Sequence, residues 1–401
     1  MDLKSGYPFW PIKSGLIRSY PALAEDLTCD VAIIGGGITG ALVAYYLSEA
    51  GARITVLDRR DIGTGSTSAS TALLQYEVDT PLTELATMVG EVAAARSYML
   101  CRDAISTIGE LTRAIGDDCG FAPKKSLYFA SSQRDAKAIE REYAARRAIG
   151  IYLDLLDRSD IEHRFSFSAP CALLSRDGAQ VDAYRLCHAL LAASAARGAT
   201  VADRTAVTKI EQDGGGVTLR TDRGPRVTAR KLVFASGFES QQYLRKKLVD
   251  FKATYALISE PLATFPGWGE EQCLIWESAR PYIYMRTTDD GRVLVGGEDD
   301  SNDNELKRDR SLGRKTRRLG RRFAGMFPAI TLDVAYSWAG TFGETKDGLA
   351  YIGETSEYPN AYFALGYGGN GITYSVIAAQ MIRDAFLGHQ NPDAQIFRFD
   401  R

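Results

Sequence analysis

The stretch VAIIGGGITGALVAYYLSEAGARITVLD, residues 31–58, contains the motif G-x-G-x-x-G at Gly35, Gly37 and Gly40. An apolar run precedes the glycines, a helical pattern follows them, and a second apolar run ends just before Asp58. This order predicts a strand, a helix and a second strand, with the motif at the first turn. A βαβ unit of this kind is typical of proteins that bind a dinucleotide.

Each residue of the motif has a chemical role in that interpretation. Gly35 permits a tight turn, Gly37 lets the backbone approach a pyrophosphate, and Gly40 lets the helix pack closely on the strand. The helix N-terminus offers N–H groups to the phosphates. The Asp58 carboxylate can accept hydrogen bonds from the adenosine ribose. The unit alone does not distinguish FAD from NAD.

A second glycine cluster, ALGYGGNGITYS at residues 364–375, lies between an apolar strand pattern and a closing helical pattern. Glycine is used where the backbone approaches a ligand closely or takes positive φ. A Ser/Thr-rich stretch, GSTSASTALL at residues 65–74, follows the βαβ unit, and KLVFASG ends a buried strand pattern at residue 237.

In these places the chain resembles the D-amino-acid oxidase superfamily, which includes glycine oxidase, sarcosine oxidase and D-amino-acid dehydrogenase. The resemblance rests on VAIIGGGITG…VLD, GSTSASTALL, KLVFASG and the pair DGLAYIG…YFALGYGGNGI, in that order. It covers most of the chain beyond residue 25 and implies FAD rather than NAD. The fold it implies is α/β, a Rossmann-like FAD-binding domain with a discontinuous α+β substrate domain built on an antiparallel sheet.

The resemblance also implies domain boundaries. Residues 25–80, 180–250 and 340–390 would form the FAD-binding domain. Residues 81–179 and 251–339 would form the substrate domain. The remaining segments would be an irregular N-terminal arm, residues 1–24, and a C-terminal tail, residues 391–401. Within the substrate domain, the apolar spacing from residue 82 to about residue 150 predicts helices.

Residues 65–74, which we call the flavin loop, would run beside the flavin ring. Residues 366–373, the last loop, would lie at its pyrimidine end, where N–H groups at a helix N-terminus can stabilise the charge that grows on reduction. The expected cofactor contacts are Gly35, Gly37, Ile38, Thr39, Gly40, Asp58, Arg59, Ser66, Thr67, Ser70, Thr71, Ala72, Val207, Ala235, Ser236, Gly237, Gly340, Gly366, Gly369, Asn370, Gly371, Ile372 and Thr373.

The chain departs from the family at its usual reactive positions. Relatives similar to glycine oxidase place an arginine where this chain has Thr341 and Phe342. Relatives similar to sarcosine oxidase hold flavin covalently through a cysteine near the position of Gly340, so FAD is expected to bind non-covalently here. Their substrate lysine corresponds to Thr373, and their oxygen-activating lysine to Leu294. The substrate and the choice between oxidase and dehydrogenase therefore stay open.

Replacement residues for the substrate pocket are found elsewhere. Tyr282, Tyr284 and Arg286 alternate along a predicted strand and share one face, and Arg286 could bind a substrate carboxylate bidentately. The alternative is a surface arginine beside core tyrosines. Tyr76, at the end of the flavin loop, and Glu344 are further catalytic or substrate-pocket candidates.

Residues 305–327 predict a basic amphipathic helix, with nine Lys or Arg and one Asp between residues 307 and 322. Its positive face could dock an anionic membrane, nucleic acid or an acidic electron acceptor. The alternative is a solvated helix face. The net charge of the whole chain is −2, which gives no general reason to expect nucleic acid.

The cysteine and histidine patterns exclude several classes of site. The six cysteines have no CxxC pair, and the three histidines are isolated. We therefore expect no metal site and no disulfide framework, as in a reducing compartment. The N-terminus has no signal-like apolar region, which favours a cytoplasmic location.

The leading functional hypothesis is an FAD-dependent oxidoreductase that oxidises the C–N bond of a small amine or amino acid by hydride transfer. Oxygen or an electron carrier would accept the electrons. One alternative is an FAD-dependent 2-hydroxy-acid dehydrogenase that passes electrons to a quinone or carrier. Another is a flavin-bound, non-catalytic interaction module that binds its partner through Arg314, Arg317 and Arg321.

Overall fold

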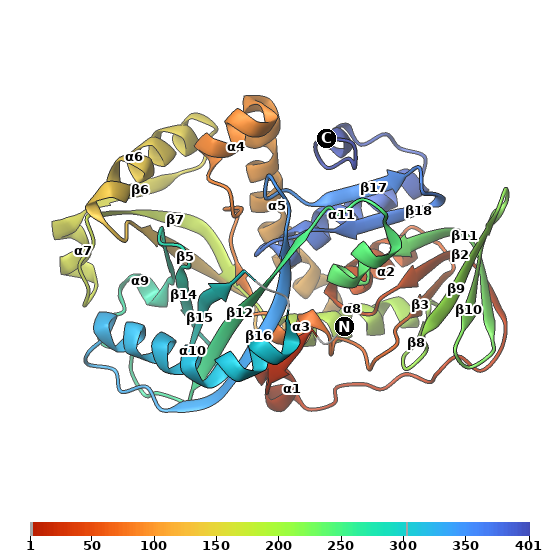
Figure 1. Ribbon diagram of the computed structural model, residues 1–401, viewed down its shortest axis with the longest axis horizontal. Coiled ribbons are helices and arrows are strands. Elements are labelled where there is room, and N and C mark those ends of the chain that lie inside the picture. The colour runs from red at the N-terminus through yellow and green to blue at the C-terminus, as the bar shows by residue number, and fades with distance from the viewer. Residues whose placement is uncertain (1–2, 302–303) are drawn as a thin grey trace.

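Two β-sheets lie side by side along the long axis of the molecule (Figure 1). The computed structural model describes residues 3–301 and 304–401, so residues 1–2 of the predicted arm fall outside the described residues. None of the described helices is both long and apolar enough to cross a membrane.

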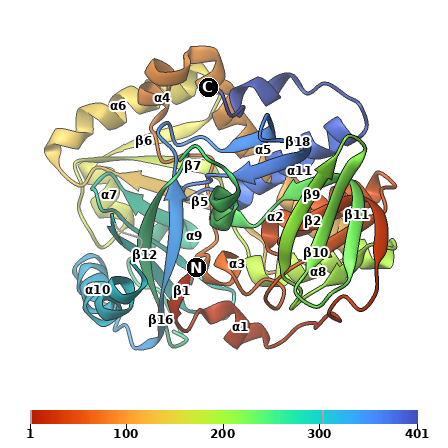
Figure 2. The ribbon, with the colours of Figure 1, turned by 45° about the vertical axis from the view of Figure 1, so that its right-hand side comes forward.

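The first sheet has eight strands and contains the predicted βαβ unit. Its central strands β18, β11, β2, β3 and β8 are parallel, and β17 is an antiparallel edge strand. In sheet order the strands are β17 (Tyr351–Thr355), β18 (Tyr358–Leu365), β11 (Arg226–Phe234), β2 (Leu27–Ile34), β3 (Ile54–Leu57) and β8 (Thr200–Ala202). The hairpin of β9 (Val207–Asp213) and β10 (Gly216–Thr221) pairs with β11 and extends away from the second sheet (Figure 2).

Three helices cover this sheet because their apolar side chains match its buried face. The helix α2 (Ile38–Glu49) is buried along almost its whole length, since it packs between α8 (Ala183–Ala196) and α11 (Gly371–Phe386). The Asp182 side chain caps α8 by accepting from the N–H groups of Tyr184 and Arg185.

The second sheet has ten strands and is mostly antiparallel. In sheet order they are β1 (Lys4–Gly6), β16 (Val334–Glu344), β12 (Asp250–Ser259), β15 (Val293–Asp300), β14 (Ile283–Thr287), β13 (Leu274–Glu277), β5 (Ala122–Phe129), β7 (Cys171–Gln180) and β4 (Leu73–Leu74), with β6 (Leu153–Asp157) paired to β7. The segments that we expected in the FAD-binding domain therefore contribute β4 and the end of β16 to this second sheet.

Helices surround the second sheet, and α10 lies along one of its faces (Figure 1). The remaining helical segments are α1 (Phe9–Ser14), α3 (Ser66–Ala69), α4 (Leu82–Val89), α5 (Glu91–Ile115), α6 (Gln133–Ala148), α7 (Arg158–Arg164), α9 (Gly269–Gln272) and α10 (Glu305–Met326), with the 3-10 turns η1 (Gly237–Tyr243) and η2 (Pro392–Ile396).

Two expectations from the sequence are wrong. The N-terminal arm is not irregular, because β1 adds an edge strand to the second sheet and α1 buries Phe9 and Trp10. The segment from residue 82 to residue 150 is not helical throughout, because β5 interrupts it. Its inner half, Ser126 to Phe129, is buried between β13 and β7, so sheet pairing decides its conformation.

Candidate active site

A cavity of about 630 Å³ is lined by residues from both sheets. The first sheet contributes the carboxyl ends of β2 and β3, which is where open α/β sheets bind ligands. The second sheet contributes Thr254 from β12, Tyr284 from β14 and Trp338 from β16. The cavity therefore joins the predicted dinucleotide motif to the predicted substrate domain.

The glycine motif forms the tight turn that its sequence predicts. Gly35 has φ +113°, and a Cβ on it would lie 2.4 Å from the Ala235 carbonyl oxygen. A Cβ on Gly40 would lie 1.8 Å from the Gly35 carbonyl oxygen. The helix α2 can therefore start this close to β2 only with glycine at both positions.

Asp58 lies at the carboxyl end of β3 and lines the cavity. Its carboxylate accepts from the Gly36 N–H at 2.7 Å and from the Arg60 N–H at 2.8 Å. Burial raises the pKa of Asp58, although these two hydrogen bonds oppose that shift. The carboxylate is thus fixed beside the motif, where a ribose hydroxyl could reach it.

Side chains from distant parts of the chain hold the flavin loop by its carbonyl groups. Trp10 Nε1 donates to the Ser70 carbonyl at 2.6 Å, and Trp338 Nε1 donates to the Ala69 carbonyl at 2.8 Å. The Thr67 hydroxyl accepts from the Ile38 N–H at 2.9 Å, which links the loop to the first turn of α2. The loop is therefore fixed before any ligand binds.

The site fits a flavin dinucleotide by its own geometry. The cavity is lined by every expected cofactor contact except Gly40 and Gly366. Gly40 packs against the Gly35 backbone, and Gly366 packs against the side chain of Thr345. Ser66 Oγ and the Tyr367 hydroxyl are buried and line the cavity, and neither has a hydrogen-bond partner among the described residues. Such orphaned polar atoms are costly unless a ligand or water satisfies them.

The last loop is tied to the segment Gln75–Asp79, which we call the cavity segment. Asn370 Nδ2 donates to the carbonyls of Gln75 at 3.1 Å and Glu77 at 2.9 Å. The Gly369 N–H donates to Asp79 Oδ2 at 2.9 Å. Because three hydrogen bonds join the two segments, their positions at the cavity depend on each other.

Arg286 does not line the cavity, which corrects its expected role as a carboxylate anchor. Its side chain is 2% exposed, and it donates to the carbonyls of Thr71 at 2.8 Å and Val181 at 3.1 Å. The guanidinium also lies 4.9 Å from the Trp10 ring centre. Burial lowers the pKa of Arg286 to about 10, so it stays charged at neutral pH. Arg286 supports the flavin loop, whereas Tyr284, two residues earlier, lines the cavity.

Tyr76 and Glu344, the other substrate-pocket candidates, do not line the cavity either. The cavity segment alternates, so Tyr76 is buried in the core while its neighbours Gln75 and Glu77 line the cavity. Glu344 forms an ion pair with Lys252 on the neighbouring strand β12.

Sequence reasoning missed several residues that line the cavity. These are Glu77 and Asp79 of the cavity segment, and Trp276 and Arg280 around the turn between β13 and β14. The alternation of polar and apolar residues in QYEVD was the signal that could have identified the first two.

A buried charge cluster stands behind the cavity segment. Arg146 of α6 is 1% exposed and pairs with Glu77 at 3.1 Å and Glu142 at 3.0 Å. Glu142 also accepts from the N–H groups of Leu82 at 3.1 Å and Thr83 at 2.7 Å. Through Arg146 and Glu142, α6 therefore holds both the cavity segment at Glu77 and the start of α4.

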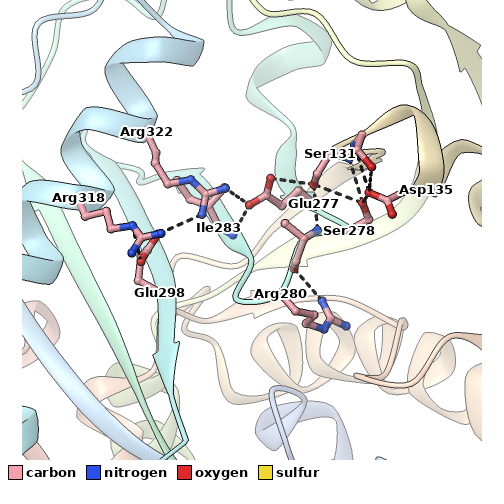
Figure 3. Close-up of polar contacts among 11 residues, drawn as sticks. Ser131, Asp135, Glu277, Ser278, Arg280, Ile283, Glu298, Arg318 and Arg322 are labelled. Carbon is pink, nitrogen blue, oxygen red and sulfur yellow. Dashed lines mark hydrogen bonds and ion pairs between the residues drawn. The ribbon is translucent and has the colours of Figure 1, made fainter.

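The basic helix α10 is anchored by buried carboxylates (Figure 3). Arg318 pairs with Glu298 at 3.0 Å, and Arg322 pairs with Glu298 at 3.2 Å and with Glu277. Glu277 also accepts from the Ile283 N–H and the Ser131 hydroxyl, both at 2.9 Å. It thereby holds both ends of the turn that carries Arg280. Other cations of α10, namely Lys307, Arg310, Arg314, Arg317 and Arg321, are exposed.

The Glu277→Ala substitution is expected to lower the free energy of unfolding by about 2–3 kcal/mol, because it removes two buried hydrogen bonds and a partner of Arg322. Denaturant unfolding measures this change. Ser131→Ala removes only one of the contacts of Glu277, together with exposed hydrogen bonds from Ser278 and Ala279, and its expected cost is about 1 kcal/mol. Equal costs for the two variants would contradict the anchoring role of Glu277.

Known proteins share both the sequence pattern and the fold. The model of the DAO family, described as FAD dependent oxidoreductase, matches residues 30–385. Glycine oxidase from Geobacillus kaustophilus is 27% identical over 374 residues, which cover 88% of this chain and 92% of that protein. Gamma-glutamylputrescine oxidoreductase from Escherichia coli is 26% identical, with 95% and 87% covered. The structure of L-proline dehydrogenase from P. horikoshii superposes with a TM-score of 0.77 at 17% identity, with 94% and 99% covered.

Proposed function

Because this chain belongs to the DAO family of FAD-dependent oxidoreductases, we propose that it oxidises the C–N bond of a small amine or amino acid in the cavity between its two sheets. The observation that carries the proposal is the continuity of this cavity. It runs from the G-x-G-x-x-G turn, past the flavin loop, to a wall formed by Trp276, Tyr282 and Tyr284.

We further propose that FAD is held non-covalently along this cavity. Gly340 lines the cavity at the position nearest to the flavin-linking cysteine of some relatives, and it offers no nucleophile. The six cysteines are all buried and free, and none of them lines the cavity as described. The residues that would hold FAD are the expected contacts given above, with Asp58 at the ribose and the last loop at the pyrimidine end.

FAD, when bound, supplies the hydride acceptor. The chain's own residues would orient the substrate, exclude water and stabilise charge. The N–H groups in the first turn of α11 stabilise negative charge at the last loop, since a helix N-terminus carries partial positive charge. Trp276 and Tyr282 provide aromatic walls that exclude water from the substrate. The hydrogen bonds to the cavity segment hold the last loop in place during the reaction.

The proposal is tested by anaerobic mixing of the purified yellow protein with amines, N-methyl amino acids, D-amino acids and 2-hydroxy acids. We expect an amine or an amino acid to bleach the flavin absorbance, because hydride transfer reduces the ring. If only 2-hydroxy acids bleach the flavin, the reaction is the oxidation of an alcohol carbon and not of a C–N bond. A protein that purifies without flavin and cannot take up FAD would refute the proposal.

A further inference from the structure

The charged residues that line the cavity fall into two groups. Arg59 and Arg60 pair with Glu239 near Asp58, at the dinucleotide end. At the other end the cavity is lined by Glu77, Asp79 and Arg280. With Arg286 turned away under the flavin loop, this second group is the one that a charged substrate meets.

Asp79 lines the cavity, and its carboxylate is held by a backbone N–H rather than by an ion pair. Burial raises the pKa of Asp79, whereas the nearby Arg280 and Lys252 favour its charged form. Oδ2 accepts from the Gly369 N–H at 2.9 Å, which places the carboxylate beside the last loop. In residues 3–301 and 304–401, no lysine or arginine forms an ion pair with this carboxylate. The nearby Arg280 donates instead to the Asp79 carbonyl oxygen, at 3.2 Å, and its guanidinium lies 4.8 Å from the Tyr282 ring centre.

Glu77 lines the same end of the cavity. The residue is 5% exposed, and its Oε1 pairs with Arg146 at 3.1 Å. Its Oε2 is buried and has no hydrogen-bond partner among the described residues. A buried acceptor without a donor is costly, so this atom indicates a ligand or a water that donates to it.

Aromatic rings complete this end of the cavity. The rings of Tyr282 and Tyr284 lie 5.7 Å apart, and Trp276 stacks on Tyr128 with ring centres 3.9 Å apart. Aromatic faces attract cations, most strongly where water is excluded. A carboxylate beside such rings forms a site for a positively charged group, whereas a negatively charged group would be repelled by Asp79.

We propose that Asp79 is the cation anchor of the cavity, and that the substrate is an amine whose ammonium group pairs with Asp79 rather than an amino acid held by its carboxylate. This inference rests on the proposed function and names the substrate class for it. Arg280 is exposed and engaged with the Asp79 carbonyl oxygen, so it is not the primary anchor.

The test titrates the flavin-loaded protein with three probes of one chain length, n-butylamine, 1,4-diaminobutane and butanoate. Binding is followed by the perturbation of the visible flavin spectrum and does not require turnover. We expect both amines to bind more tightly than butanoate. Asp79→Asn keeps an acceptor for the Gly369 N–H but loses the charge, and should raise the Kd of both amines by about 10- to 100-fold. Arg280→Met removes a positive charge near Asp79, so it should leave the Kd of both amines unchanged or lower it.

Asp79→Glu retains the charge and should keep the preference for amines, which separates loss of charge from misfolding. The inference is overturned if butanoate binds more tightly than the amines to the unsubstituted protein, if the amines leave its spectrum unchanged, or if Arg280→Met weakens binding while Asp79→Asn does not. Failure of the proposed function looks different, since amines would then bind through Asp79 without bleaching the flavin.

Discussion

The Gly40→Ala variant is expected to purify without bound flavin. The new Cβ would lie 1.8 Å from the Gly35 carbonyl oxygen, and no rotamer can relieve that overlap because it involves only backbone and Cβ. The start of α2 must therefore move away from β2 and carry the phosphate-facing N–H groups with it. We expect a cost of about 3 kcal/mol or more, which corresponds to a Kd for FAD raised by about 100-fold or more.

The measurement is the flavin-to-protein absorbance ratio, followed by titration of the apoprotein with FAD. Gly320→Ala is the matched control, because Gly320 lies within α10 and a Cβ there meets nothing within 4 Å. This control should keep its flavin and gain up to about 1 kcal/mol of stability from helix propensity. Full flavin content in Gly40→Ala would contradict the close packing of α2 on the glycine turn.

Arg146→Met is expected to lower the free energy of unfolding by about 3–5 kcal/mol, because it leaves Glu77 and Glu142 buried without their counter-ion. Burial already raises the pKa of Glu77, and loss of Arg146 raises it further. A carboxyl group whose folded pKa is raised binds more protons in the folded state, so its destabilising effect grows as pH rises through that pKa. The loss should therefore be smaller at about pH 5 than at about pH 8.

Denaturant unfolding at both pH values measures this effect. Arg53→Met is the control, since Arg53 pairs with Asp30 at the surface with its side chain 68% exposed. Its expected cost is within about 1 kcal/mol. A cost for Arg146→Met as small as that of the control, or one that does not change with pH, would show that the buried cluster does not hold the cavity segment.

The sequence predicted the dinucleotide half of the cavity in detail because its signals are local. Gly35 and Gly40 act through backbone geometry and Asp58 through its carboxylate, all within one βαβ unit, and their placement follows from residue type and spacing. The helix α10 was predicted for the same reason. Each of these features follows mainly from the types and spacing of residues close in sequence.

The substrate half could not be predicted to the same depth, because its geometry depends on pairing between distant strands. Arg286 shares a strand face with Tyr284, but the position of the flavin loop over β14 decides which of them reaches the cavity. Likewise, the sequence of β5 lies in a region with a helical pattern, and its pairing with β7 and β13 on both sides makes it a strand. Such non-local pairings leave little trace in the spacing of single residues.

The supports of the flavin loop also bear on how the chain is made. Trp10 is synthesised long before Trp338, and Lys4 finds its strand partner only at Gly340. The loop therefore gains its last tryptophan support only after residue 338 has left the exit tunnel. A nascent chain that stops before this residue would carry the dinucleotide motif with a flavin loop that is only partly held to receive the ring.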